Sequence, residues 1–235
     1  MDVADRRRPI ALVTGANGAL GRAITAALRK DYFTIGTDLD EASAPCDAFY
    51  ACDVRDSRAL QALFDLITER HGPTQHLVNN AAIYQPCGFL AMNADQIDLT
   101  FSVNVRALLL ATQHAARQMI AAGVNGAVVN IASQAGRDGS PTIDYAASKA
   151  AVINITRSTA RALASANIRV NAVAPGVFRS AMSDQMSAEN FERMMRITPM
   201  ARIGEAEEIA DAVAYLLGPR STYVTGATLD VNGGI

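Results

Sequence analysis

Short apolar segments alternate with longer amphipathic segments along nearly the whole chain. The apolar segments are rich in β-branched residues and predict buried strands at 9–14, 32–37, 48–52, 76–78, 126–132, 169–174 and 227–231. The amphipathic segments repeat apolar residues at three- and four-residue spacing, which predicts helices with one buried side. These helices are expected at 22–30, 55–70, 95–121, 144–164 and 205–217.

The alternation of strands and helices predicts the α/β fold class, with a three-layer, doubly wound parallel sheet that has helices on both faces. In such a fold, ligands bind at the carboxyl ends of the strands. No linker divides the 235 residues. We therefore expect a single domain over 1–235.

Composition argues against several classes of function. The formal net charge is −2, so no basic excess is available to bind nucleic acid or an anionic membrane. Arg6, Arg7 and Arg8 cluster before the first strand, where a solvated arm is expected. No apolar run approaches the roughly 20 residues of a membrane span, which favours a cytoplasmic protein. The three cysteines and three histidines lack metal-ligand spacing, so we expect no metal and no disulfide.

A glycine-rich turn joins the first predicted strand to the first predicted helix. Gly15 permits a tight turn, and Gly21 lets the helix pack closely on the strand. The helix N-terminus would then present unpaired N–H groups to a pyrophosphate. Because strand, turn and helix occur in this order, a dinucleotide site is favoured over a purely structural turn. The expected cofactor contacts in the turn are Gly15, Asn17, Gly18, Ala19, Leu20 and Gly21.

The ends of the next strands predict the adenosine side of this site. Asp38 ends the second strand, where its carboxylate can accept hydrogen bonds from both ribose hydroxyls and would repel a 2′-phosphate. Asn17 and Leu39 beside it are uncharged, so NAD is predicted rather than NADP. The alternative is a solvated strand-end carboxylate. Further expected contacts are Leu39, Asp53 and Val54 near adenine, and Asn80, Ala81 and Ala82 after the fourth strand.

Three side chains able to perform acid–base chemistry follow the strand at 126–132. Tyr145 and Lys149 are four residues apart on one predicted helix, so they lie on the same side of it. Lys149 is expected to lower the pKa of Tyr145, and Asp144 to cap the first turn of the helix. The Ser133 hydroxyl could bind the oxygen of an alcohol or ketone while Tyr145 moves its proton. A helix-surface pair without a catalytic role is the alternative interpretation.

Three further features of the predicted helices and loops bear on function: a polar residue in an apolar stretch, a methionine-rich segment and an alanine-rich helix. Asn104 lies within an apolar helical stretch and needs a partner if it is buried. Segment 181–200 contains five methionines, which suits a mobile substrate lid or ordinary core. The alanine-rich helix at 144–164 is expected to pack closely against another helix, either of this chain or of a second subunit.

Several short motifs occur along the chain in a fixed order. They are Thr14-Gly-x-x-x-Ala-x-Gly21, Asn79-Asn-Ala-Ala82, the set Asn104, Ser133, Tyr145 and Lys149, then Pro175-Gly176, and finally Tyr223-Val-Thr-Gly226 with Asp230-Val-Asn-Gly-Gly234. Together they resemble the single-domain branch of the short-chain dehydrogenase/reductase family. Ala19 stands where the family often has glycine, and Ser133 precedes Tyr145 by twelve residues, one fewer than is usual.

The resemblance implies a Rossmann-like sheet of about seven strands and hydride transfer between nicotinamide and a carbinol or carbonyl carbon. It implies that Tyr145 is the acid/base, that Ser133 orients the substrate and that Lys149 holds the nicotinamide ribose. Asn104 would fix a water that relays protons. It also implies a homotetramer or homodimer. The nicotinamide itself would be lined by Pro175, Gly176, Val177 and Ser180.

From these features we expect an NAD-dependent oxidoreductase that acts on a secondary alcohol, diol or polyol. The alternatives are a reductase of an acyl-chain or quinone carbonyl, and a non-catalytic module that senses NAD. The sequence leaves the substrate open. The candidate substrate-binding residues are Ser133, Gln134, Ala135, Tyr84, Phe178, Met182 and Met186.

Overall fold

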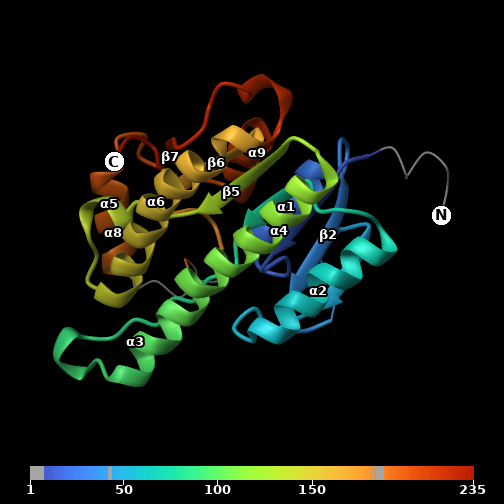
Figure 1. Ribbon diagram of the computed structural model, residues 1–235. Helices are drawn as coiled ribbons and strands as arrows, with labels where there is room; N and C mark the ends of the chain where they lie inside the picture. Colours follow the sequence, from blue (N-terminus) through green and yellow to red (C-terminus); the bar gives the residue numbers. More distant parts are fainter. Residues whose placement is uncertain (1–7, 42–43, 181–182, 184–187) are drawn as a thin grey trace.

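Seven parallel strands form one sheet in the computed structural model, which describes residues 8–41, 44–180, 183 and 188–235 (Figure 1). The strand order is β3-β2-β1-β4-β5-β6-β7. The chain places β2 and β3 on one side of β1 and then returns to place β4 to β7 on the other side. The predicted fold class is confirmed. The strands are β1 (Ile10–Thr14), β2 (Phe33–Asp38), β3 (Ala48–Ala51), β4 (His76–Asn79), β5 (Gly126–Ile131), β6 (Ile168–Pro175) and β7 (Thr228–Val231).

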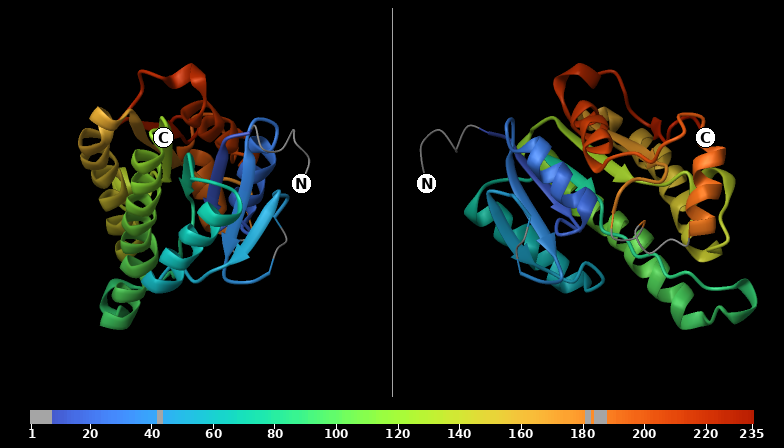
Figure 2. Two further views of the ribbon diagram at one scale, coloured as in Figure 1. Left: turned by 45° about the vertical axis from the view of Figure 1, so that its right-hand side comes forward. Right: turned by 180° about the vertical axis from the view of Figure 1, so that it is seen from behind.

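Helices cover both faces of this sheet (Figure 2). The main helices are α1 (Ala19–Leu28), α2 (Ser57–Arg70), α3 (Ala94–Phe101), α4 (Leu108–Ala122), α6 (Ile143–Leu163) and α9 (Ala206–Leu217). Two more are α5 (Ala135–Asp138) and α8 (Ala188–Ile197), and four further segments are η2 (Phe89–Ala91), η3 (Ser102–Ala107), η4 (Ala164–Ala166) and η5 (Pro219–Ser221). Neither α5 nor α8 was predicted: α5 is only one turn long, and α8 lies in segment 181–200, which was interpreted as a substrate lid or core.

The core divides into two main layers because successive strand side chains point to opposite faces. Leu12 contributes to the layer beneath α2 and α4, whereas its neighbours Ala11 and Val13 contribute to the layer beneath α1 and α9. Phe64 of α2 and Ile209 of α9 are essentially fully buried in these two layers. Covering both faces explains why the strands are apolar at nearly every position.

Buried amides fix two helices on the sheet. Asn79 at the end of β4 donates to Thr112 of α4 at 2.9 Å and to Asn130 of β5 at 2.8 Å. Asn130 in turn donates to Thr156 of α6 at 2.9 Å. A buried amide without hydrogen-bond partners is costly, so these bonds fix the position of α4 and α6 on the carboxyl half of the sheet.

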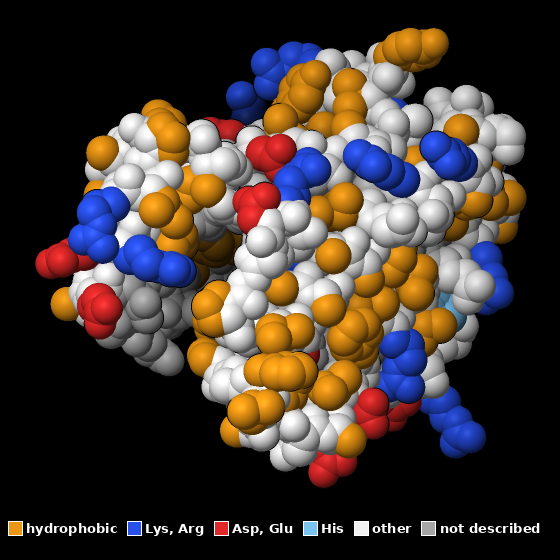
Figure 3. Space-filling view, turned by 90° about the vertical axis from the view of Figure 1, so that its left-hand side faces the viewer, with side chains coloured by type: hydrophobic (Ala, Val, Ile, Leu, Met, Phe, Trp, Pro, Cys, Tyr) orange, Lys and Arg blue, Asp and Glu red, His pale blue; other side chains and the backbone are white. Residues whose placement is uncertain are grey.

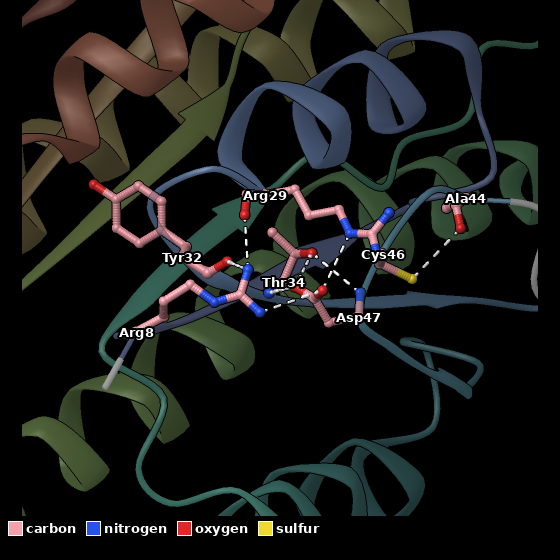
Figure 4. A network of polar contacts seen from close by, with 7 residues as sticks. All are labelled: Arg8, Arg29, Tyr32, Thr34, Ala44, Cys46 and Asp47. Atoms are coloured by element: carbon pink, nitrogen blue, oxygen red, sulfur yellow. Dashed lines mark hydrogen bonds and ion pairs between the residues drawn. The ribbon is translucent and has the colours of Figure 1, made fainter. Parts of the chain in front are cut away.

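An ion network closes the opposite, amino-terminal edge of β1 and β2 (Figure 4). Arg8 donates to the carbonyls of Arg29 and Tyr32 at 2.8 and 3.1 Å and pairs with Asp47 at 3.5 Å. Asp47 also accepts from the Thr34 amide at 2.9 Å. The expectation of a solvated arm is therefore wrong for Arg8, because these partners lie more than twenty residues away in the sequence. Arg6 and Arg7 lie outside the described residues.

Two predicted helices differ from their expected form. The helix predicted at 95–121 is interrupted by a π-helical segment, η3, between α3 and α4. The helix expected from Asp144 begins at Ile143, and Asp144 does not cap it. Its Oδ2 instead accepts a hydrogen bond from Thr100 of α3 at 2.7 Å, so this buried carboxylate joins two helices.

The described part of the chain has no helix that is both long and apolar enough to cross a bilayer. Cys46, Cys52 and Cys87 are free thiols. Across the same described ranges, no group of three or more His, Cys, Asp or Glu side chains is placed to hold a metal ion.

Candidate active site

The glycine turn after β1 is bound to the segment that follows β4. Thr14 Oγ1 accepts hydrogen bonds from the backbone N–H groups of Asn80 and Ala81, both at 3.1 Å. The Asn80 side chain donates to the carbonyls of Thr14 and Gly15 at 3.0 and 2.9 Å. Gly15 has a φ of +65°, and a Cβ there would lie 2.8 Å from Ala81 Cα. The close approach therefore requires glycine at this position.

The start of α1 fits a dinucleotide pyrophosphate. Its N-cap, Gly18, supplies no side-chain cap, and the first turn contains no acidic residue. A Cβ on Gly18 would approach only the Gly15 carbonyl, at 3.6 Å, whereas one on Gly21 would collide with that carbonyl. The turn is thus open at Gly18 and tightly packed at Gly21. Ala19, the departure from the family pattern, is the first residue of α1.

Asp38 lies beside this turn, as predicted. Its Oδ2 accepts from the Asn17 amide at 2.9 Å and its Oδ1 from the Leu39 amide at 2.8 Å. The Asn17 side chain reaches the carbonyls of Asp40 and Glu41. These bonds orient the carboxylate at the end of β2, and its contact with a ribose remains a prediction.

The residues expected near adenine follow β3. Asp53 pairs with Arg55 at 2.6 Å, and the hydrogen bonds from Arg55 hold the pKa of Asp53 below its usual value. Val54 and Ala81 line a small cavity together with Thr14. Their adenine contacts also remain predictions.

Ser133 follows β5 at the carboxyl edge of the sheet. Its Oγ accepts from the Ala135 amide at 3.1 Å, and its hydroxyl is close enough to Tyr145 to lower the pKa of that phenol. A Cβ on Gly136 would lie 2.5 Å from the Lys149 carbonyl carbon, so α5 touches the backbone of α6. Gly136 therefore brings the Ser133 loop to Tyr145. Gly136 was not among the site residues predicted from the sequence.

Tyr145 and Lys149 lie together on α6, as their spacing predicts. Lys149 Nζ is 5.6 Å from the centre of the Tyr145 ring and donates to the Ile131 carbonyl at 2.7 Å. Burial lowers the pKa of Lys149 to about 8. Burial also raises the pKa of Tyr145, the Ser133 hydroxyl offsets part of the rise, and Tyr84 adds to it. The expectation of a lowered tyrosine pKa is therefore wrong, because desolvation prevails.

Asn104 is buried within η3 and its amide is well satisfied. The Oδ1 atom accepts from the Ile83 amide at 2.9 Å, while Nδ2 donates to the Ile83 carbonyl at 3.1 Å and to Ser148 Oγ at 3.0 Å. Ser148 Oγ donates to the Tyr145 carbonyl at 2.7 Å. Since both amide protons are used, the implied proton-relay water could meet only Oδ1 or the main chain of Asn104.

Tyr84, one of the predicted substrate-side residues, lies against Tyr145. Its ring meets that of Tyr145 edge-on, with centres 5.1 Å apart and planes at 86°. Its hydroxyl accepts a hydrogen bond from Thr142 Oγ1 at 3.2 Å. Sequence reasoning missed Thr142, which its position three residues before Tyr145 could have indicated.

The other predicted substrate residues are arranged differently. Gln134 donates through Nε2 to Asp138 at 3.3 Å, and Ala135 begins α5. Phe178 is partly buried against the core layer of α1 and α9 and forms a backbone bridge with Gly204, and its contact with the substrate remains a prediction. Met182 and Met186 lie outside the described residues.

The segment after β6 is held by β7. The Gly176 amide donates to the Val231 carbonyl at 3.0 Å, and the Pro175 carbonyl accepts from the Gln134 amide at 3.0 Å. Ser180 forms reciprocal hydrogen bonds with Ser183. The predicted nicotinamide-facing residues Pro175, Gly176, Val177 and Ser180 thus follow directly on the carboxyl end of β6.

Comparison with known proteins identifies the family. A family model described as Enoyl-(Acyl carrier protein) reductase matches residues 20–235. The chain is 32% identical to (3R)-3-hydroxyacyl-CoA dehydrogenase of Homo sapiens, over 97% of this chain and 96% of that protein. It is 34% identical to 3-oxoacyl-(acyl-carrier-protein) reductase FabG of Staphylococcus aureus (96% and 97%) and 35% identical to Nodulation protein G of Rhizobium meliloti (96% and 96%). The chain belongs to the short-chain dehydrogenase/reductase family.

This short-chain dehydrogenase/reductase is therefore an oxidoreductase of CH–OH and carbonyl groups that binds a nicotinamide cofactor. The segment between Ser133 and Tyr145 is one residue shorter than is usual in the family. It contains α5, then Gly139 with a φ of +82°, and then Thr142 at the N-cap of α6. The loop that differs from the family pattern thus adjoins Tyr84.

Proposed function

We propose that this oxidoreductase interconverts a 3-oxoacyl thioester and the corresponding 3-hydroxyacyl thioester. The hydroxyacyl-CoA dehydrogenase and the FabG reductase, which match nearly the whole chain, are named for such substrates, and this favours the acyl-chain alternative over a diol or polyol. The observation that carries the proposal is that Ser133, which follows β5, lies near enough to Tyr145 of α6 to lower the pKa of its phenol. One carbonyl oxygen could then accept from both hydroxyl groups.

We further propose NAD as the cofactor, on the basis of the carboxylate of Asp38. Bound nicotinamide would supply or accept the hydride at the carbon that carries the oxygen. The glycine turn and the start of α1 would hold the pyrophosphate, and Asp38 would hold the adenosine ribose. Lys149 and Tyr145 would contact the nicotinamide ribose.

The tyrosine suits the reduction direction at neutral pH. Because burial raises the pKa of Tyr145, its phenol keeps its proton and can donate it to the substrate oxygen as negative charge develops there. Ser133 would hold the same oxygen by a second hydrogen bond. In the oxidation direction the phenol must first lose its proton, so oxidation should require a higher pH than reduction.

The direct test is oxidation of NADH by acetoacetyl-CoA, compared with NAD reduction by a panel of secondary alcohols, cyclic diols and sugar alcohols. The expected result is turnover of the thioester that is lost in Tyr145→Phe and kept in Tyr223→Phe, a matched change at a fully exposed tyrosine. Turnover of a polyol but not of the thioester would refute the substrate class. Binding of NADH without any turnover would favour the sensing module.

The cofactor preference has a separate test in Asp38→Asn. Removing the charge should lower the preference for NADH over NADPH, measured as the ratio of kcat/KM values, by on the order of 10- to 100-fold. A wild-type enzyme that prefers NADPH would refute NAD as the cofactor and leave the substrate proposal intact.

We also propose that the protein assembles into dimers or tetramers. Exposed apolar side chains near α3 and the start of α6 support this, among them Leu90, Ile97 and Ile143. Figure 3 views the molecule from this side and displays hydrophobic side chains gathered in its lower part. Light scattering during size-exclusion chromatography gives the test, in which a mass of 24.9 kDa would refute assembly.

A further inference from the structure

The threonine at the start of α6 does not cap its own helix. Threonine at an N-cap ordinarily accepts a hydrogen bond from a backbone N–H of the first turn. Thr142 makes no such side-chain bond, although it is buried with 3% of its surface exposed. Its Oγ1 donates instead to the Tyr84 hydroxyl at 3.2 Å. The helix thus begins without its usual cap, and the hydroxyl orients a tyrosine from the segment after β4.

This bond joins two hydroxyl groups, and either of them can donate it. When Thr142 donates, the Tyr84 proton is available to a ligand. The Tyr84 and Tyr145 rings meet edge-on with centres 5.1 Å apart, so Tyr84 lies against the proposed acid/base. A second donor therefore stands next to the pair that would hold the reacting oxygen.

The other polar side chains proposed for the substrate side are already engaged. Gln134 directs Nε2 to Asp138 at 3.3 Å. Ser133 accepts from the Ala135 amide and lowers the pKa of Tyr145. The hydroxyl of Tyr84 bonds Thr142, and it can do so as the acceptor and keep its own proton for a ligand.

We propose that Tyr84 is a specificity-determining residue that donates a hydrogen bond to the second carbonyl oxygen of the substrate, with Thr142 as its positioning residue. This inference rests on the proposed function, because a 3-oxoacyl thioester carries two carbonyl groups separated by one methylene. Ser133 and Tyr145 hold the 3-oxo oxygen, and Tyr84 holds the thioester oxygen. The pair of bonds fixes which face of the 3-oxo carbon is presented to the cofactor.

A cycle that changes both enzyme and substrate tests this role. The enzymes are wild type, Tyr84→Phe and the control Tyr223→Phe. The substrates are acetoacetyl-CoA and its thioether analogue, in which a methylene replaces the thioester carbonyl. Tyr84→Phe should lower kcat/KM for acetoacetyl-CoA by on the order of 10- to 100-fold and change kcat/KM for the thioether by less than about 2-fold. Thr142→Val should act in the same direction, and Thr142→Ser should restore the wild-type selectivity.

Each outcome separates the role of Tyr84 from the function on which it rests. Equal losses with both substrates would overturn the inference, because Tyr84 would then only pack against Tyr145. An unchanged kcat/KM with both would also overturn it. In either case wild-type turnover of acetoacetyl-CoA would leave the proposed function standing. A wild type that turns over neither substrate would overturn both proposals.

Discussion

Replacing Gly136 with alanine should separate catalysis from cofactor binding. The new Cβ would lie 2.5 Å from the Lys149 carbonyl carbon and 2.6 Å from the Ala150 nitrogen, both backbone atoms of α6. Ordinary contact begins near 3.4 Å, so α5 must move away from α6 by about 0.9 Å. This movement carries Ser133 away from Tyr145. A misplacement of about 1 Å can cost on the order of 100-fold in rate, and overpacking typically costs about 1–3 kcal/mol of stability.

The assay for Gly136→Ala combines three measurements. Turnover of acetoacetyl-CoA should fall by on the order of 100-fold. The dissociation constant of NADH, measured by fluorescence, should stay within about 2-fold, because the glycine turn after β1 is untouched. Urea unfolding should report the loss of stability. Gly88→Ala is the matched control, since a Cβ there meets no atom within 4 Å. If Gly136→Ala kept wild-type turnover, close packing of α5 would not be what positions Ser133.

Three further predictions concern stability. Burial lowers the pKa of Lys149 from 10.5 to about 8, so between these pH values the unfolded state binds one proton more than the folded state. The unfolding free energy of wild type should therefore rise by up to about 3 kcal/mol as the pH rises from 8 to 10.5. A Lys149→Met variant with the same rise would refute this. Although burial alone would raise the pKa of Asp47, hydrogen bonds from Thr34 and Arg29 lower it overall. Asp47→Asn should therefore lower the free energy of unfolding by about 1–3 kcal/mol at pH 7. The difference from wild type should shrink below pH 4, where the wild-type carboxylate becomes protonated. An unchanged urea midpoint at pH 7 would contradict a stabilising role for this network. Arg169 donates to three carbonyls at the end of α9, at 2.7, 3.0 and 3.3 Å. Arg169→Met should therefore lower the midpoint of thermal unfolding, measured by calorimetry, by several degrees. An unchanged midpoint would show that these bonds do not stabilise the protein.

The regular spacing of apolar residues along the sequence made the sheet and most of the helices that cover it predictable. A strand covered on both faces is apolar at nearly every position, so the segments around Leu12, Val128 and Val170 were recognisable without knowledge of their neighbours. Four-residue spacing placed Tyr145 and Lys149 on one side of α6 because helix geometry is local. What could be predicted is therefore what depends on nearby residues in the sequence.

Partners far apart in the sequence decided the rest. Asp144 was expected to cap α6 because its own position suggests it, but its partner Thr100 is 44 residues away. Lys149 was expected to lower the pKa of Tyr145, whereas its ammonium donates to the Ile131 carbonyl. The part played by Gly136 depends on the backbone of α6. None of these contacts leaves a periodic signal in the sequence.

The bonds between Thr14 and the segment after β4 bear on how the protein acquires its cofactor site during folding. The glycine residues of the turn are made early in synthesis, but the groups that fix them come 65 to 67 residues later. A nascent chain that ends before β4 has every glycine of the motif and lacks the partners that hold the turn. Cofactor affinity should therefore arise only after β4 has docked beside β1, which makes NADH binding a reporter of that step in refolding.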